Sequence, residues 1–87
     1  MVAEAADDLA AIVAYIREDD PSAAQRTANE IYHRAGALTT FPHRGRQGRV
    51  KGTRELPLPP HPFIVVYRIL TDAVEIVNII HGAQRWP

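Results

Sequence analysis

Histidines and a group of cations are the residues of this chain that could take part in chemistry. The four histidines are His33, His43, His61 and His81, and no two of them have the short helical spacing of paired metal ligands. Cysteine is absent, which excludes disulfides, thiol catalysis and cysteine-based zinc sites. The sequence therefore predicts no metal site and no cofactor. Histidine can act as an acid or base near neutral pH, and arginine and lysine can bind anionic groups.

The charge of the chain is unevenly divided, although its formal net charge is zero. Residues 1–42 carry three basic residues against seven acidic ones, and residues 43–87 carry seven basic residues against three acidic ones. Four of the basic residues fall between Arg44 and Lys51. This asymmetry favours an anionic partner for the second half, either nucleic acid or an acidic protein segment. The alternative is a basic loop that is simply solvated.

The length of 87 residues, of which 46% are hydrophobic, predicts one small globular domain that spans residues 1–87. No signal peptide is visible after Met1. The apolar runs of the chain, Phe63–Tyr67 among them, are far shorter than the roughly 20 residues that cross a bilayer. The expected location is the cytoplasm, with no membrane partner.

The first half has the periodicity of two helices. In residues 4–18 an apolar stripe recurs at helical spacing and consists of Leu9, Ile12, Val13 and Ile16. Asp20 is a suitable N-cap, and Pro21 suits the first position of a second helix that runs to about Leu38. The second helix presents an alanine-rich face, so the two helices can pack closely as a hairpin.

The second half has the pattern of β-strands. Residues 41–48 form a predicted loop, and the predicted strands cover residues 49–56, 63–70 and 74–81. The prolines of residues 57–62 interrupt the sheet because proline lacks a backbone donor. The prediction is an α+β fold, with a helical hairpin packed on a small antiparallel sheet. The helices cover one face of that sheet and leave the other face for a partner.

Several ordered segments of the chain resemble the RelE/ParE toxins, the growth-inhibiting halves of bacterial type II toxin–antitoxin modules, some of which serve plasmid stabilisation. The segments are Asp8–Ile16, Asp20–Ala24, Gly52–Leu56, Pro62–Arg68 and Val74–Ala83. The resemblance implies a RelE/ParE-like fold and a cognate antitoxin as partner, in a toxin–antitoxin heterotetramer or beside a toxin homodimer. Members of this family usually begin with a β-strand, but only Met1 and Val2 precede the first helix here. The strand is therefore expected to be either missing or truncated, and in both cases an open sheet edge is expected.

The resemblance implies two kinds of target, and each gives the residues a different role. RelE-like members cleave messenger RNA on the ribosome; for this chemistry His81 would be the base or acid, and Arg54 would hold the phosphate. Alternatively, His81 caps a strand end, and Arg54 pairs with Glu55, Glu75 or an antitoxin carboxylate. The predicted contacts with nucleic acid or antitoxin are Arg46, Arg49, Lys51, Arg54 and Arg85.

Two departures count against RNA cleavage. RNA-cleaving members commonly carry an arginine where this chain has Ile64, and many end in a tyrosine where this chain has Trp86-Pro87. Trp86 is expected to anchor the tail by packing, and Tyr67 is expected in the core. ParE-like members inhibit DNA gyrase by binding it, which needs no catalytic set. The sequence therefore favours gyrase over the ribosome as target, and a non-toxic module that only binds an antitoxin is a third hypothesis.

Overall fold

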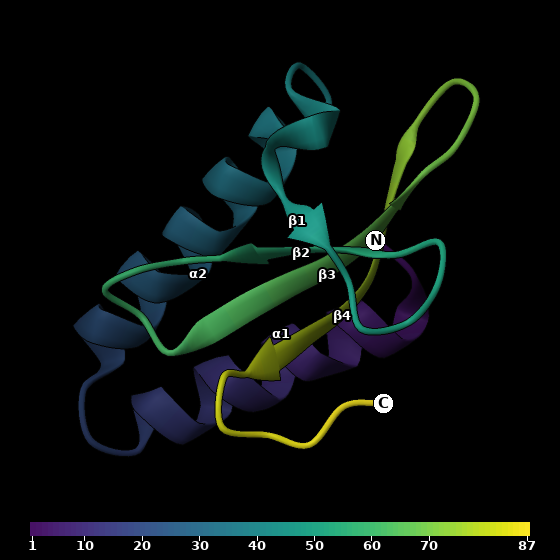
Figure 1. Cartoon of the computed structure of the whole chain (residues 1–87). Helices are drawn as coiled ribbons and strands as arrows, with labels where there is room; N and C mark the ends of the chain where they lie inside the picture. Colours follow the sequence, from purple (N-terminus) through teal and green to yellow (C-terminus); the bar gives the residue numbers. More distant parts are fainter.

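The computed structural model describes all 87 residues, which form two helices packed against a four-stranded antiparallel sheet (Figure 1). The elements are α1 (Ala3–Arg17), α2 (Pro21–Ala37), a short 3-10 helix η1 (Pro42–Arg44), β1 (Arg46–Gln47), β2 (Arg54–Pro57), β3 (Phe63–Ile69) and β4 (Val74–His81). The strand order is β1-β2-β3-β4, so strands that follow one another in sequence are neighbours in the sheet. The predicted α+β fold is confirmed. Neither helix is long and apolar enough to cross a membrane.

The helical hairpin begins as its sequence predicts. The Asp20 side chain accepts the backbone N–H of Ala23 at 3.0 Å, and Pro21 is the first residue of α2. Ala24 and Ile31 of α2 are fully buried, which allows the close approach of α1. The alanine-rich face of α2 is therefore a packing surface.

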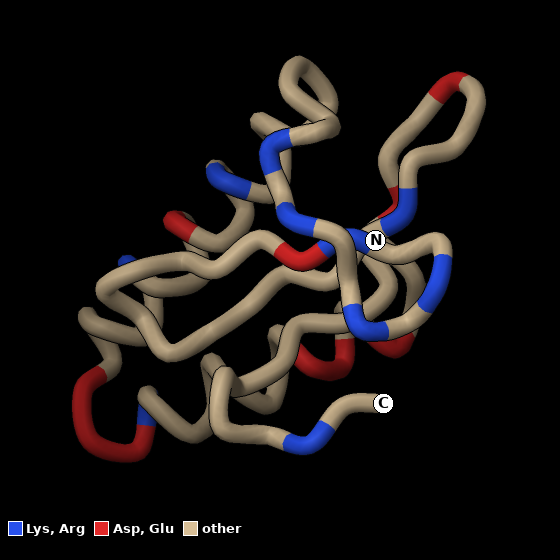
Figure 2. The backbone as a smooth tube through the Cα atoms, in the orientation of Figure 1, with Lys and Arg blue, Asp and Glu red and all other residues tan.

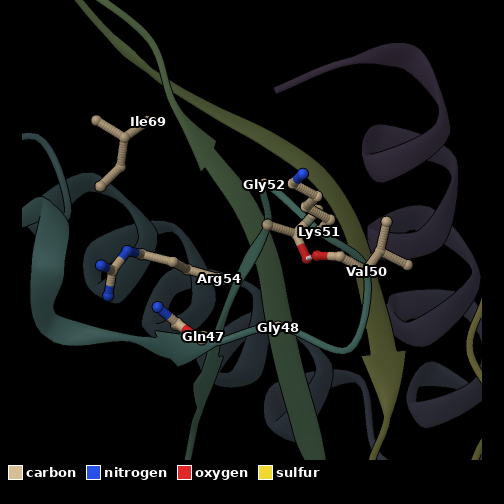
Figure 3. A pocket seen from close by; sticks show the side chains of 8 residues that line it. Gln47, Gly48, Val50, Lys51, Gly52, Arg54 and Ile69 are labelled. Atoms are coloured by element: carbon tan, nitrogen blue, oxygen red, sulfur yellow. Dashed lines mark hydrogen bonds between the residues drawn. The ribbon is translucent and has the colours of Figure 1, made fainter.

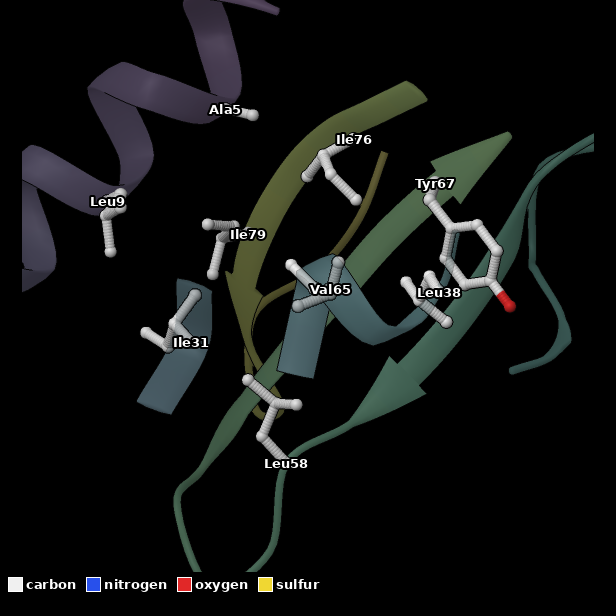
Figure 4. Close-up of a cluster of buried hydrophobic side chains, with 10 residues drawn as sticks. Ala5, Leu9, Ile31, Leu38, Leu58, Val65, Tyr67, Ile76 and Ile79 are labelled. Carbon is white, nitrogen blue, oxygen red and sulfur yellow. The ribbon is translucent and has the colours of Figure 1, made fainter. Parts of the chain in front are cut away.

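The main core lies between the helices and the sheet (Figure 4). Its buried residues are Ala5, Leu9, Ile31, Ala35, Leu38, Leu58, Val65, Tyr67, Ile76 and Ile79. Tyr67 is completely buried, as expected, and its hydroxyl donates to the carbonyl of Pro42 at 2.6 Å. The same hydroxyl accepts the N–H of Gly45 at 2.8 Å. Tyr67 therefore holds the segment before β1 against the core.

The prediction of one strand over residues 49–56 was wrong for residues 49–53. These residues belong to a turn, and the chain pairs with itself as a hairpin in which Arg46 faces Glu55 and Gln47 faces Arg54. The Gly48 N–H donates to the Thr53 carbonyl at 2.8 Å and closes the turn. Gly52 has a φ of +84°, a conformation that glycine adopts without steric cost. The sheet therefore gains the short strand β1 inside the predicted loop.

The expected open edge at β4 is partly closed by the first residues of the chain. α1 begins at Ala3, and no strand precedes it in this chain. The Val2 N–H donates to the Ile76 carbonyl at 3.0 Å. The Asp8 carboxylate accepts the Ile79 N–H at 2.8 Å and the Asn78 side-chain amide at 3.0 Å. Two main-chain groups of this edge strand are thus satisfied by α1 and the residue before it, and not by another strand.

The sheet face opposite the helices is not left uncovered, which corrects the expectation of a bare face. Ile64, Val66 and Ile80 form a second buried cluster there, each at most 8% exposed. Val77 and Trp86 pack against this cluster. Figure 1 shows the β1–β2 turn and the C-terminal tail passing over this side of the sheet. Trp86 is thus a packing anchor, as predicted.

Candidate functional site

The side chains of Arg46 and Arg49 are bound to the buried carboxylate of Glu55. Glu55 is 1% exposed and accepts Arg46 Nη2 at 3.3 Å and Arg49 Nε at 3.2 Å. It also accepts the backbone N–H of Arg49 at 2.9 Å. Two of the predicted contact cations therefore hold the β1–β2 hairpin together. Glu55 cancels one of their two positive charges within the chain.

The environment of Glu55 keeps its carboxylate ionised. Burial alone would raise the pKa of Glu55, but hydrogen bonds from the Arg49 backbone and from the Arg49 and Arg46 side chains outweigh it. The resulting pKa lies below the ordinary glutamate value. From the sequence, Glu55 was expected only as a possible partner for Arg54. The available signal was a lone carboxylate in an extended segment among many cations.

Arg54 is anchored to a neutral group. Its Nη1 donates to the Gly45 carbonyl at 2.7 Å, while Glu55 binds Arg46 and Arg49, and Glu75 binds Arg68. The suggested pairing of Arg54 with Glu55 or Glu75 is therefore not formed. A carbonyl oxygen orients the guanidinium without cancelling its charge, so Arg54 keeps a full positive charge and further donors.

Arg54 and Lys51 line an open recess of about 300 Å³, called the basic recess below (Figure 3). Its lining residues are Gln47, Gly48, Val50, Lys51, Gly52, Thr53, Arg54 and Ile69. No acidic residue is among them. Figure 2 shows basic residues gathered on the β1–β2 hairpin, whereas acidic residues lie mainly on the helices and their connection. The recess therefore suits an anionic group.

His81 lies at the end of β4 with its ring engaged at one nitrogen. Its Nδ1 accepts the N–H of Ala83 at 3.1 Å, and its ring meets Phe63 edge-on at 6.1 Å. Because Nδ1 accepts a hydrogen bond, the neutral ring carries its hydrogen on Nε2. This geometry matches the reading in which His81 caps the strand end.

His81 also lines an apolar groove of about 510 Å³ between α1 and the start of β3. The other lining residues are Ala11, Ile12, Tyr15, Ile16, His61, Pro62 and Phe63. His61 is fixed at the rim, because its Nε2 lies 2.7 Å from a carboxylate oxygen of Glu30 on α2. The hydrogen bond from His61 lowers the pKa of Glu30. No cation lies in this groove that could hold a phosphate beside His81.

His81 and Arg54, the predicted catalytic pair, are not brought together. His81 is paired with Phe63, the first residue of β3, and Arg54 is paired with Tyr67, farther along the strand. At ~3.3 Å per residue these positions are roughly 13 Å apart along the strand. The groove beside His81 and the basic recess share no lining residue. Arg85 is exposed in the tail and forms no ion pair.

Comparison with known proteins agrees with this architecture. The family model described as "ParE toxin of type II toxin-antitoxin system, parDE" matches residues 2–86. The chain is 49% identical over 76 residues to the protein Y4kP of Sinorhizobium fredii, which covers 87% of this chain and 78% of the relative. It is 39% identical over 77 residues to Toxin RelE2 of Caulobacter vibrioides. This match covers 88% of this chain and 85% of the relative.

A solved structure has the same fold. The "Chromosomal ParDE TA system from P. aeruginosa" superposes with a TM-score of 0.83 at 26% identity and covers 92% of this chain and 89% of that one. Both the sequence match over nearly the whole chain and the shared fold support the same assignment. The chain belongs to the ParE toxin family of type II toxin–antitoxin systems.

Proposed function

We propose that this toxin inhibits DNA gyrase by binding it in the cytoplasm and cleaves no RNA itself. The observation that supports this proposal most strongly is the position and burial of Ile64 in the sheet. RNA-cleaving RelE-like toxins commonly have an arginine at this strand position, whereas Ile64 lies between Pro57 and Ile80 in the sheet and is 8% exposed. An isoleucine cannot stabilise a charged phosphorane, and loss of one such cation costs about a hundredfold or more in rate.

The distance between His81 and Arg54, the two candidate catalytic residues, supports the same proposal. A base and a phosphate-binding cation must reach one scissile phosphate, each at a heavy-atom distance of ~2.6–3.2 Å or through one water. His81 lies in an apolar groove, and Arg54 lies in the basic recess at the other end of β3. A toxin that acts by binding needs no such convergence.

Cleavage of messenger RNA on the ribosome is the alternative, and the names of two relatives favour it. Toxin RelE2 and Toxin RelE1 of Caulobacter vibrioides are 39% and 30% identical to this chain. In this alternative His81 and Arg54 would be the residues to substitute first. A third candidate is a module that binds an antitoxin but has lost its toxicity.

Expression of the chain in bacteria without an antitoxin separates these functions. We expect growth arrest, plasmids that lose negative supercoiling, and intact reporter messenger RNA. Co-expression of the cognate antitoxin is the control and should restore growth. Ribosome-dependent cleavage of the reporter that disappears in His81→Ala and Arg54→Ala would overturn the proposal. Normal growth at the same level of folded protein would leave only the non-toxic module.

A further inference from the structure

Lys51 and Arg54 are the cations of the β1–β2 hairpin whose charge has no carboxylate partner. Arg46 and Arg49 bind Glu55, and farther away Arg68 binds Glu75. Lys51 is exposed in the turn, and Arg54 binds only the Gly45 carbonyl. Of the five predicted contact cations, Arg46 and Arg49 are therefore paired, Arg85 lies apart in the tail, and two line one recess. Figure 3 shows the Arg54 guanidinium and the Lys51 ammonium pointing in different directions, so each can pair with a separate carboxylate of a partner.

An apolar surface adjoins the basic recess. Ile69 and Leu70, at the end of β3, are 36% and 46% exposed. They line a second recess of about 240 Å³, called the hairpin recess, together with Thr39, Pro42, Thr71, Asp72, Ala73 and Val74. Ile69 lines both recesses, so the cations and the aliphatic side chains form one continuous surface. Figure 1 shows the β3–β4 hairpin projecting beyond the body of the molecule at this end.

The charges along this surface also set a direction. Lys51 and Arg54 lie in the basic recess, whereas the only acidic residue of the two linings, Asp72, lies in the hairpin recess. A partner carboxylate is attracted at the first end and repelled at the second. The complementary segment is therefore acidic at one end and aliphatic at the other.

We infer that the toxin-binding segment of the cognate antitoxin docks on this surface. At least one of its carboxylates enters the basic recess, and a neighbouring aliphatic side chain covers Ile69 and Leu70. The inference rests on the membership of the chain in a toxin–antitoxin family and not on gyrase as the target. The expected antitoxin contacts are therefore on this surface. They are no longer the outer face of the sheet, which is covered, or Arg46 and Arg49, which are paired with Glu55.

The surface fits a protein segment better than nucleic acid. Nucleic-acid affinity comes mainly from several cations that contact successive phosphates. Here two unpaired cations stand beside exposed aliphatic side chains, which offer a phosphate backbone nothing. Burial of Ile69 and Leu70 against an aliphatic side chain is favourable, because it removes apolar surface from water.

The test is the affinity of the full-length toxin for its purified cognate antitoxin, measured by calorimetry. We expect Lys51→Glu, Arg54→Gln and Leu70→Asp each to weaken binding by about tenfold or more. Arg26→Gln and Arg17→Glu change exposed cations on the helices and should stay within about twofold. Lys51→Glu should also flatten the dependence of affinity on salt.

Thermal unfolding of each variant distinguishes lost contact from lost fold. Arg54→Gln removes the bond to Gly45, so Lys51→Glu and Leu70→Asp, which change exposed side chains, carry the test. Affinities within about twofold of the unchanged toxin for both variants would overturn the inference. Two other results would contradict the inference, provided that antitoxin affinity stayed unchanged. The variants could lose binding to a labelled single-stranded RNA, or they could convert a toxin dimer into monomers. Failure to inhibit gyrase would leave the result untouched.

Discussion

Glu55 accepts the backbone N–H of Arg49 at 2.9 Å, and this bond crosses the turn that joins β1 to β2. The same carboxylate also binds the Arg49 side chain, so one buried group fixes both the backbone and the cation of the turn. Because the turn lines the basic recess, Glu55 positions that recess without entering it.

Substitution of Glu55 by glutamine should lower the free energy of unfolding by about 1–3 kcal/mol. Glutamine keeps the shape but removes the charge that Arg46 and Arg49 share. Urea denaturation measures the change. The matched control is Glu75→Gln, because the pair between Glu75 and Arg68 is exposed and should contribute only about 0–1 kcal/mol. Equal effects of the two substitutions would contradict the account of Glu55.

The contribution of Glu55 should depend on pH in one direction. Its folded pKa lies below its unfolded value, so the unfolded chain binds more protons as the pH falls. The contribution is therefore present above the unfolded pKa and is lost as the pH falls through the folded pKa. Urea denaturation of the natural chain and Glu55→Gln should show a stability difference that is largest near neutral pH and shrinks in acid. A stability difference between the two proteins that grows as the pH falls would contradict this prediction.

Substitution of Tyr67 by phenylalanine should cost about 1–3 kcal/mol, because it leaves the Gly45 N–H and the Pro42 carbonyl without their shared partner. Thermal or urea unfolding provides the measurement. Tyr15→Phe is the control, since Tyr15 is 76% exposed and its change should stay within about 0.5 kcal/mol. A Tyr67→Phe protein as stable as this control would mean that the hydroxyl does not hold the segment.

Substitution of Asp8 by alanine should expose the edge of β4. The Ile79 N–H would lose its acceptor, so its hydrogen exchange should accelerate and stability should fall by about 1 kcal/mol. The neighbouring Asp7→Ala changes an exposed carboxylate and should leave the exchange of Ile79 unaltered. Equal exchange in the two variants would argue against capping by Asp8.

Much of the fold was predictable because it depends on local patterns. The apolar stripe around Leu9, the Asp20-Pro21 start of α2 and the β-branched runs of β3 and β4 each report on neighbours in sequence. The β1–β2 hairpin was missed because its pairing depends on Glu55 reaching Arg49 across a turn. The cover of the outer sheet face was missed because Trp86 lies in a tail without periodicity.

The candidate site was predictable in composition but not in arrangement. The basic residues between Arg46 and Arg54 were identified, yet sequence spacing alone could not separate the cations that bind Glu55 from those that line the recess. Exposure of Ile69 and Leu70 likewise depends on where the helices end over the sheet. These features arise from tertiary packing.

The central claim, a toxin that acts by binding gyrase, is tested most directly by supercoiling of a relaxed plasmid with purified DNA gyrase. Purified toxin should inhibit supercoiling, and His81→Ala should inhibit it at the same concentration within about twofold, because inhibition by binding needs no catalytic step at His81. Absence of inhibition by the unchanged toxin, together with ribosome-dependent RNA cleavage that His81→Ala abolishes, would contradict the claim.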